Sequence, residues 1–414
     1  MTRVIHTGDT HVGYQQYHSP ERRADFRRAF AAVVDDAIEA DVDAVVHAGD
    51  LFHDRRPELP DLMAVLSALR RLDDADIPFL AIVGNHEATR TGEWLDLFEG
   101  TGLATRLDDS PEIVGDTAFY GLDWVPESRR DELEYEFEDH DAAHAALVSH
   151  GLFTPFEFGE WDTETVLGDA TVEFDAMLLG DNHKADTAEV AGTWVTYCGS
   201  TERASASEED ARGYNLVTFD DGVDIRRRSL DTRPFAFVSV DLAEGEGVER
   251  VREQVRQHDL ADAVCIVEIT GEGEPVTPAA IEEAGEAEGA LLVRVTDRRE
   301  IDEEADIGVS FADPDEAVNE RVSEMGLSTA ARDVDETVRE SKVADSNVRE
   351  EVKNRVTDLL GDDPGAFEPA GDDEEAVAGG ATDDDATDGS EADAEADEPT
   401  ANGDDEQGTM EEYL

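Results

Sequence analysis

The chain has 414 residues, and its 104 acidic residues against 33 lysines and arginines give a formal net charge of −71. Such charge repels itself in dilute buffer but is screened at molar salt, where the Debye length is about 3 Å, so we expect a cytoplasmic protein of an extreme halophile. Two cysteines outside any C-x-x-C pair exclude a disulfide framework and cysteine zinc sites, and the chain has neither a signal-peptide core nor an apolar run near the ~18 residues of a membrane span.

Residues 1–200 alternate short apolar runs with helical patterns, which is typical of an α/β protein. The apolar runs that predict strands are 4–6, 42–47, 79–83, 145–148, 174–179 and 195–197, and apolar residues recur at helical spacing in 26–38 and 59–69. The first five runs end in polar residues beside a glycine, namely Gly8-Asp9, Gly49-Asp50, Gly84-Asn85-His86, His150-Gly151 and Gly180-Asp181-Asn182-His183. Binding sites form at this edge of open α/β sheets, and glycine allows the sharp turns that bring side chains together.

The pattern changes after residue 230. Residues 231–300 hold three apolar runs and one helical stretch, which predict a small α+β domain. The segment 301–360 is weakly patterned until an apolar stripe of Val348, Val352, Val356 and Leu359 predicts a helix, with an N-cap in 345–347. Residues 361–414 contain 21 acidic residues and no lysine or arginine, so we expect a disordered acidic tail.

The polar strand ends together form a candidate metal site. They supply carboxylates, imidazoles and one amide oxygen, from Asp9, His11, Asp50, Asn85, His86, His150, Asp181 and His183. This is the ligand set of two hard-to-borderline divalent cations such as manganese or iron. A single D-x-H motif is common in proteins of any function, but five such strand ends favour one shared metal site.

The order D-x-H, G-D, G-N-H-E, S-H-G, G-D-N-H resembles the calcineurin-like metallophosphoesterases across residues 1–200. Further segments resemble the DNA double-strand-break repair nucleases of that group, which include bacterial SbcD and the meiotic-recombination-eleven nuclease. These segments are His11-Val12-Gly13-Tyr14, Asp50-Leu51-Phe52-His53 and Tyr197-Cys198-Gly199-Ser200-Thr201-Glu202-Arg203. The resemblance implies a two-sheet sandwich flanked by helices in 1–230, a DNA-capping domain in 231–300 and partner binding in 301–360.

The same resemblance implies a role for each site residue. Asp9, His11, Asp50 and His183 would hold the first of two Mn²⁺ ions, and Asp50, Asn85, His150 and Asp181 the second, with a hydroxide activated by both metals attacking the phosphorus. His86 would stabilise or protonate the leaving oxygen, and His53 would position the phosphate. The family usually has histidine where Asp181 stands. Asp181 either coordinates through oxygen, which makes the site less positive, or leaves that position to water.

The resemblance also implies partners. These are DNA ends, a second copy of the chain, and a coiled-coil SMC-like ATPase of the SbcC type that docks on the 347–360 helix. The stripe in 59–69 fits either a buried core or the homodimer contact. Arg22, Arg23, Arg27 and Arg28 either face DNA phosphates or pair with neighbouring acids. Two other functions stay open: a related phosphoesterase for small molecules or proteins, and a largely non-catalytic scaffold for the ATPase.

Overall fold

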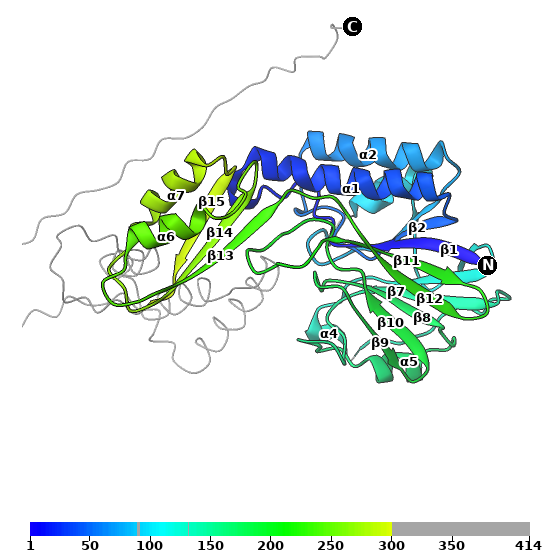
Figure 1. The fold of residues 1–414 in the computed structure, drawn as a ribbon. Helices are drawn as coiled ribbons and strands as arrows, with labels where there is room; N and C mark the ends of the chain where they lie inside the picture. Colours follow the sequence, from blue (N-terminus) through cyan, green and yellow to red (C-terminus); the bar gives the residue numbers. More distant parts are fainter. Residues whose placement is uncertain (89–91, 131, 300–414) are drawn as a thin grey trace, which may run out of the picture.

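The computed structural model describes residues 1–88, 92–130 and 132–299. The docking helix expected in 347–360 and the tail expected in 361–414 lie outside these residues. Over the described part of the chain, no helix is both long and apolar enough to cross a bilayer. Two six-stranded sheets pack face to face, and a three-stranded sheet stands beside them (Figure 1).

The first sheet has the strand order β12-β11-β1-β2-β3-β4 and is parallel from β1 to β4. Its strands are β1 (Thr2–Thr7), β2 (Ala44–His47), β3 (Phe79–Ala81), β4 (Thr105–Arg106), β11 (Gly213–Phe219) and β12 (Val223–Ser229). Its outer face carries the short turn η1 (Gln16–His18) and the helices α1 (Pro20–Ala40), α2 (Leu59–Asp73) and α3 (Trp94–Gly100).

The amino end of α1 follows from its sequence. The Ser19 hydroxyl accepts a hydrogen bond from the Arg22 amide at 3.2 Å, and Pro20 occupies the first helical position, both of which favour a helix start. The apolar stripe predicted for 26–38 faces the sheet, and Phe26, Phe30 and Val33 are buried there. Burial of this stripe holds α1 on the sheet.

The second sheet has the order β5-β6-β7-β8-β10-β9. Its strands are β5 (Glu112–Val114), β6 (Thr117–Leu122), β7 (His144–His150), β8 (Ala176–Gly180), β9 (Asp186–Val190) and β10 (Thr193–Tyr197), accompanied by α4 (Glu127–Arg130) and α5 (Thr163–Asp169). Val46 and Leu80 of the first sheet and Phe119, Val148 and Leu178 of the second are buried in one core between the sheets. The predicted two-sheet sandwich flanked by helices is confirmed.

The remaining described elements form a separate unit, here called the third unit. It contains β13 (Phe235–Leu242), α6 (Val248–Val255), β14 (Val264–Gly271), α7 (Pro278–Ala287) and β15 (Leu292–Asp297). All three strands are parallel, because each connection contains a helix and is long enough for a crossover. The three predicted strands are present, but the structure has two helices where the sequence predicted one, and the unit alternates strands and helices as β-α-β-α-β instead of segregating them as α+β.

Asp25 of α1 ties the third unit to the sandwich. Its carboxylate is almost fully buried and accepts hydrogen bonds from Arg22 and from Arg233, each at 2.6 Å, and it also pairs with Arg28. Arg233 lies in the segment that leads into β13 and pairs with Asp262 of the third unit. We call Asp25, Arg22, Arg28 and Arg233 the Asp25 cluster.

The arginines of α1 therefore make intramolecular pairs. Arg23 pairs with Asp61 and Glu58, and Arg27 lies 3.7 Å from Asp61. Their acidic partners come from α1, α2, the segment before α2 and, for Arg22, the loop after β10, where Glu202 lies 3.2 Å away, so these guanidinium groups are satisfied within the protein. Of the two interpretations left open by the sequence, the structure supports pairing over contact with DNA phosphates.

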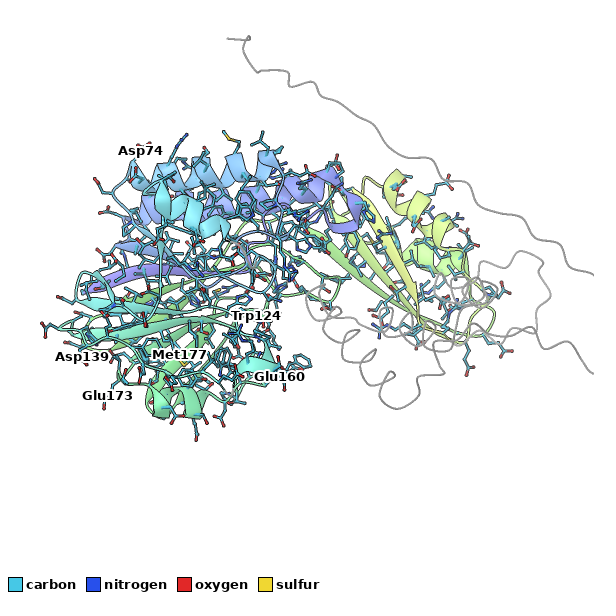
Figure 2. The ribbon with its side chains drawn as sticks, turned by 180° about the vertical axis from the view of Figure 1, so that it is seen from behind. Asp74, Trp124, Asp139, Glu160, Glu173 and Met177 are labelled. Atoms are coloured by element: carbon cyan, nitrogen blue, oxygen red, sulfur yellow. The ribbon has the colours of Figure 1, made fainter. Side chains whose placement is uncertain are left out.

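The carboxyl ends of the parallel strands in the second sheet point toward the third unit. Figure 2 shows Trp124, which follows β6, and Glu160, in the segment after β7, on the side nearer the third unit. Asp139 and Glu173, which precede β7 and β8, lie at the opposite end of the sandwich. The polar strand ends predicted to form a site thus meet beside the third unit.

Candidate metal centre

The structure brings together all seven side chains predicted as metal ligands. His11 Nε2 lies 3.0 Å from His183 Nε2, and His150 Nε2 lies 3.0 Å from Asn85 Oδ1. The seven side chains follow strands of both sheets, so the centre lies where the two sets of strand ends meet. The residues are Asp9, His11, Asp50, Asn85, His150, Asp181 and His183.

Asp50 lies between the two halves of this cluster. One of its oxygens is 3.8 Å from His11 Nε2 and 3.5 Å from His150 Nε2. The other oxygen accepts a hydrogen bond from the main-chain amide of His86 at 3.0 Å. A carboxylate with neighbours on both sides is placed as a group shared by two ions would be.

Asp181 stands at the edge of the cluster. Its Oδ1 lies 3.7 Å from His150 Nε2, and its amide donates to Asp9 Oδ1 at 3.0 Å. Within the described residues, the three-membered groups with converging ligand atoms do not include Asp181, although they do include Asp9 with Asp50 and His150. Asp181 therefore lies beside His150 but belongs to none of the groups whose ligand atoms converge.

The backbone is strained at the residues that converge. Asp9, His11, Asp50 and Asp181 all have positive φ, between 42° and 89°, a region that L-residues seldom occupy and that clusters at functional sites. The neighbouring glycines allow close approach. A Cβ on Gly84 would meet Asp50 Oδ1 at 2.1 Å, and one on Gly180 would meet the Ala48 carbonyl oxygen at 2.1 Å.

Hydrogen bonds fix the two imidazoles at opposite sides of the centre. His150 Nδ1–H donates to the Ala48 carbonyl at 2.7 Å, and His183 Nδ1–H donates to Glu208 Oε1 at 2.8 Å. With Nδ1 donating, Nε2 of each ring presents a lone pair to the centre. Such outer partners orient metal-binding histidines in proteins.

Two glutamates with no predicted role, Glu87 and Glu208, support the centre. Glu87 is buried and accepts hydrogen bonds from the amides of Leu51 and Phe52, each at 3.2 Å, so it holds the chain just after Asp50. Glu208 orients His183. Glu87 stands inside the G-N-H-E motif and could have been noticed, whereas Glu208 follows no strand and is one acidic residue among 104.

Burial and close charges shift the pKa values of the carboxylates in this cluster. Burial raises the pKa of Asp9 to about 6. Burial opposes ionisation of Asp50 as well, but the nearby His150 and His11 outweigh it and hold the pKa of Asp50 well below its usual range. Burial also raises the pKa of Asp181. Three carboxylates this close need positive charge beside them.

Burial and close charges also act on the histidines. Burial lowers the pKa of His11 well below its ordinary value. Burial disfavours charge on His183 too, but the hydrogen bond to Glu208 and the charge of Asp9 together raise its pKa to about 9. Asp50 likewise overcomes burial and raises the pKa of His150. The carboxylates thus attract positive charge onto the rings that face them.

The residues fit divalent cations. Asp9, His11 and His183 form one group of converging ligand atoms, and Asp9, Asp50 and His150 form another. Oxygen and imidazole donors of this kind suit manganese, iron or zinc. The geometry also brings His11 together with His53 and His86, so His53 and His86 lie beside the centre, as the sequence predicted, with their nitrogens close enough to face a shared ligand.

The aromatic neighbours of the centre hold His53 and His86 in place. The rings of Tyr14 and His53 stack with centroids 3.9 Å apart, and the His86 ring lies 4.8 Å from that of His11. His86 Nδ1–H donates to the His53 carbonyl at 2.9 Å. Cys198 nearby is fully buried and fills its place as a small hydrophobic residue.

Comparison with known proteins agrees with this geometry. Residues 2–168 match the calcineurin-like phosphoesterase family, and the two-sheet sandwich with a cluster of carboxylates and histidines defines a metallophosphoesterase. The chain is 71% identical to the "DNA double-strand break repair protein Mre11" of Haloferax volcanii over 373 residues, which cover 89% of this chain and 85% of that protein.

Two further relatives carry the same description. The Mre11 of Halobacterium salinarum is 60% identical over 378 residues, covering 90% of this chain and 98% of that protein. The Mre11 of Methanosarcina mazei is 43% identical over 371 residues, covering 86% of this chain and 60% of that protein. The chain belongs to the Mre11 family of DNA double-strand break repair proteins, and its relatives from Haloferax and Halobacterium support the expected halophilic source.

Proposed function

We propose that the protein is a manganese-dependent exonuclease and endonuclease that cuts DNA phosphodiester bonds during double-strand break repair. The observation that carries the proposal is the convergence of carboxylates and imidazoles around Asp50, on a chain of the Mre11 family. Oxygen-rich donor sets favour manganese among the first-row metals that such a site accepts.

The ligand assignment follows the two sides of Asp50. Asp9, His11 and His183 would hold a first ion on one side, and Asn85, His150 and Asp181 would hold a second on the other, with Asp50 contributing to both. Two bound divalent ions lower the pKa of a water molecule and stabilise negative charge on the attacking and leaving oxygens. The assignment is supported by the short distances between His11 and His183 and between His150 and Asn85.

His86 and His53 act on the substrate in this proposal. The Nδ1–H of His86 is used by the His53 carbonyl, so Nε2 is the atom that can face the leaving oxygen, and it would donate a proton there when the ring carries a hydrogen on both nitrogens. Burial lowers the pKa of His53 to about 4, which favours the neutral ring at physiological pH. A neutral His53, stacked on Tyr14, orients the phosphate by hydrogen bonding.

Two other functions can be weighed against this proposal. A phosphoesterase for small molecules or proteins has no need of an additional unit beside the strand ends, and the third unit stands there. A non-catalytic scaffold is favoured only by Asp181, whose carboxylate replaces the usual histidine and makes the centre less positive. The supporting geometry around Asp50 and His86 favours an active enzyme.

The proposed partners are DNA ends, an SMC-like ATPase and a second copy of the chain. The ATPase would dock on the 347–360 helix, outside the described residues. The homodimer would form through α2 and α3, where Leu59, Met63 and Leu97 are more than half exposed around a groove. Val65 and Leu69 of the same helix are buried in the core, so one part of the 59–69 stripe belongs to the core and the exposed part supports the dimer proposal.

The decisive experiment is a nuclease assay on linear DNA in molar KCl. We expect cleavage with Mn²⁺, weaker cleavage with Mg²⁺, and none with a chelator. Hydrolysis of a small phosphodiester with no cleavage of DNA would favour the first rival function, and tight DNA-end binding without cleavage under any metal would favour the scaffold. Sedimentation of the protein and of Met63→Glu tests the dimer separately.

A further inference from the structure

The 199–212 loop, which joins β10 to β11, holds His183, a proposed ligand of the first metal site. Glu208 is only 12% exposed at its side chain, and its Oε1 accepts the hydrogen of His183 Nδ1. Its Oε2 accepts hydrogen bonds from the Ala204 amide at 3.0 Å and from Arg212 at 3.2 Å. Arg212 also donates to the His183 carbonyl at 2.9 Å. The loop therefore holds both the ring and the main chain of His183 by hydrogen bonds.

The same loop is fastened to the third unit by Arg203. Arg203 Nε donates to the Glu208 carbonyl at 2.9 Å, and its Nη1 donates to Thr232 Oγ1 at 3.2 Å in the segment before β13. The Arg203 guanidinium carbon lies 5.1 Å from the ring centroid of Phe235, the first residue of β13. One side chain thus contacts both Glu208 and the start of the third unit.

We propose that Glu208 is a positioning residue for the first metal site and that Arg203 makes its position depend on the third unit. The inference deepens the proposed function, since it rests on His183 being a metal ligand. Glu208 fixes the ring so that Nε2 faces the ion, and its negative charge makes that nitrogen a better donor. Arg203 keeps the Glu208 main chain in place only while Thr232 and Phe235 stay packed against it. A contiguous set of contacts of this kind can couple two sites.

The test measures binding of Mn²⁺ alone to the full chain in molar KCl, by the paramagnetic resonance of free Mn²⁺. We expect Glu208→Ala to weaken one of the two sites by about 10-fold to 100-fold and to leave the other unchanged. Glu208→Gln keeps an oxygen acceptor without the charge, so it should fall between Glu208→Ala and the wild type. Glu209→Gln, the exposed neighbour, is the matched control and should bind Mn²⁺ like the wild type.

The contribution of the third unit is tested by Phe235→Leu, with Phe237→Leu as its control on the same strand. We expect Phe235→Leu to weaken the same site by about twofold to thirtyfold and Phe237→Leu to have no effect. Wild-type affinity in Phe235→Leu would overturn the dependence on the third unit.

Wild-type affinity in Glu208→Ala, or equal weakening of both sites, would overturn the positioning role. Thermal unfolding in chelator identifies any variant that has lost its fold, and Glu208→Gln then decides, since its amide is the gentler change. A wild-type protein that binds two Mn²⁺ ions but does not cut DNA would contradict the proposed function and leave this inference standing.

Discussion

His150 and His183 present the same atom, Nε2, to opposite sides of the metal centre, yet different structures hold the two rings. His150 is held by the Ala48 carbonyl, a main-chain group at the end of β2, whereas His183 is held by the side chain of Glu208 in a loop. Neighbouring strands fix a main-chain acceptor. A glutamate in a loop moves whenever the loop does. One half of the centre is therefore built into the sheets, and the other half can respond to what packs on the 199–212 loop.

His86→Ala should have the largest effect, because in the proposed function His86 acts on the substrate and belongs to neither half. We expect DNA cleavage to fall by about 10²-fold to 10⁴-fold with both metals retained. The measurement is single-turnover cleavage together with elemental analysis of the purified protein. Loss of both metals would make His86 a ligand, in the group that it forms with His11 and His53.

Gly180→Ala should disrupt the side of the centre that contains His150, whose ring is held by a main-chain carbonyl. The new Cβ would overlap the Ala48 carbonyl oxygen, the group that orients His150. We expect Mn²⁺ affinity at one site to fall by about 10-fold to 100-fold and the free energy of unfolding to drop by about 1–3 kcal/mol. Gly168→Ala, where a Cβ meets nothing within 4 Å, is the control. Equal behaviour of the two variants would show that His150 tolerates a displaced carbonyl.

Asp181→His sharpens the comparison of charge. Replacing the carboxylate by a neutral ring removes one negative charge from the half that contains His150, which makes its net charge more positive. A metal-bound water there should therefore become more acidic. The limb of the pH–rate profile that rises with pH should move to lower pH, and each pKa unit corresponds to about 1.4 kcal/mol. Cleavage below the midpoint should be faster than in the wild type. If the limb does not move and Asp181→Ala matches the wild type, Asp181 does not coordinate.

The smallest effect concerns the strands beneath the centre. Burial lowers the pKa of His6 in β1 and of His47 in β2 to about 3. The unfolded chain takes up protons near pH 6.5 while the folded chain does not, so stability falls as the pH drops from about 6.5 toward 3. In chelator, His6→Leu should make this loss smaller by about 1 kcal/mol at pH 5.5. An unchanged slope in chemical denaturation from pH 7 to pH 5 would mean that His6 is protonated in the folded state.

The sequence predicted the side chains of the centre that follow strands, on both sides of Asp50. Asp9, Asp50 and His150 follow apolar runs directly, and a local pattern of that kind is visible without the fold. Glu208 was invisible because it lies in a loop and meets His183 only after the sheets assemble. The partners of the α1 arginines were left open for the same reason, since Asp61 is supplied by another helix. The parallel strands of the third unit depend on crossovers that periodicity does not report.

The burial of the Asp25 cluster matters for how the protein responds to salt. At molar KCl, ion pairs on the surface are screened within about 3 Å, whereas Asp25 and Arg233, the pair that crosses the joint, are shielded from the solvent by burial. The joint between the sandwich and the third unit therefore keeps its strength in brine that weakens exposed pairs such as Arg226 with Asp224. In a cell whose internal salt concentration follows its surroundings, this buried joint should hold the candidate metal centre and the third unit at the same distance as the ionic strength changes.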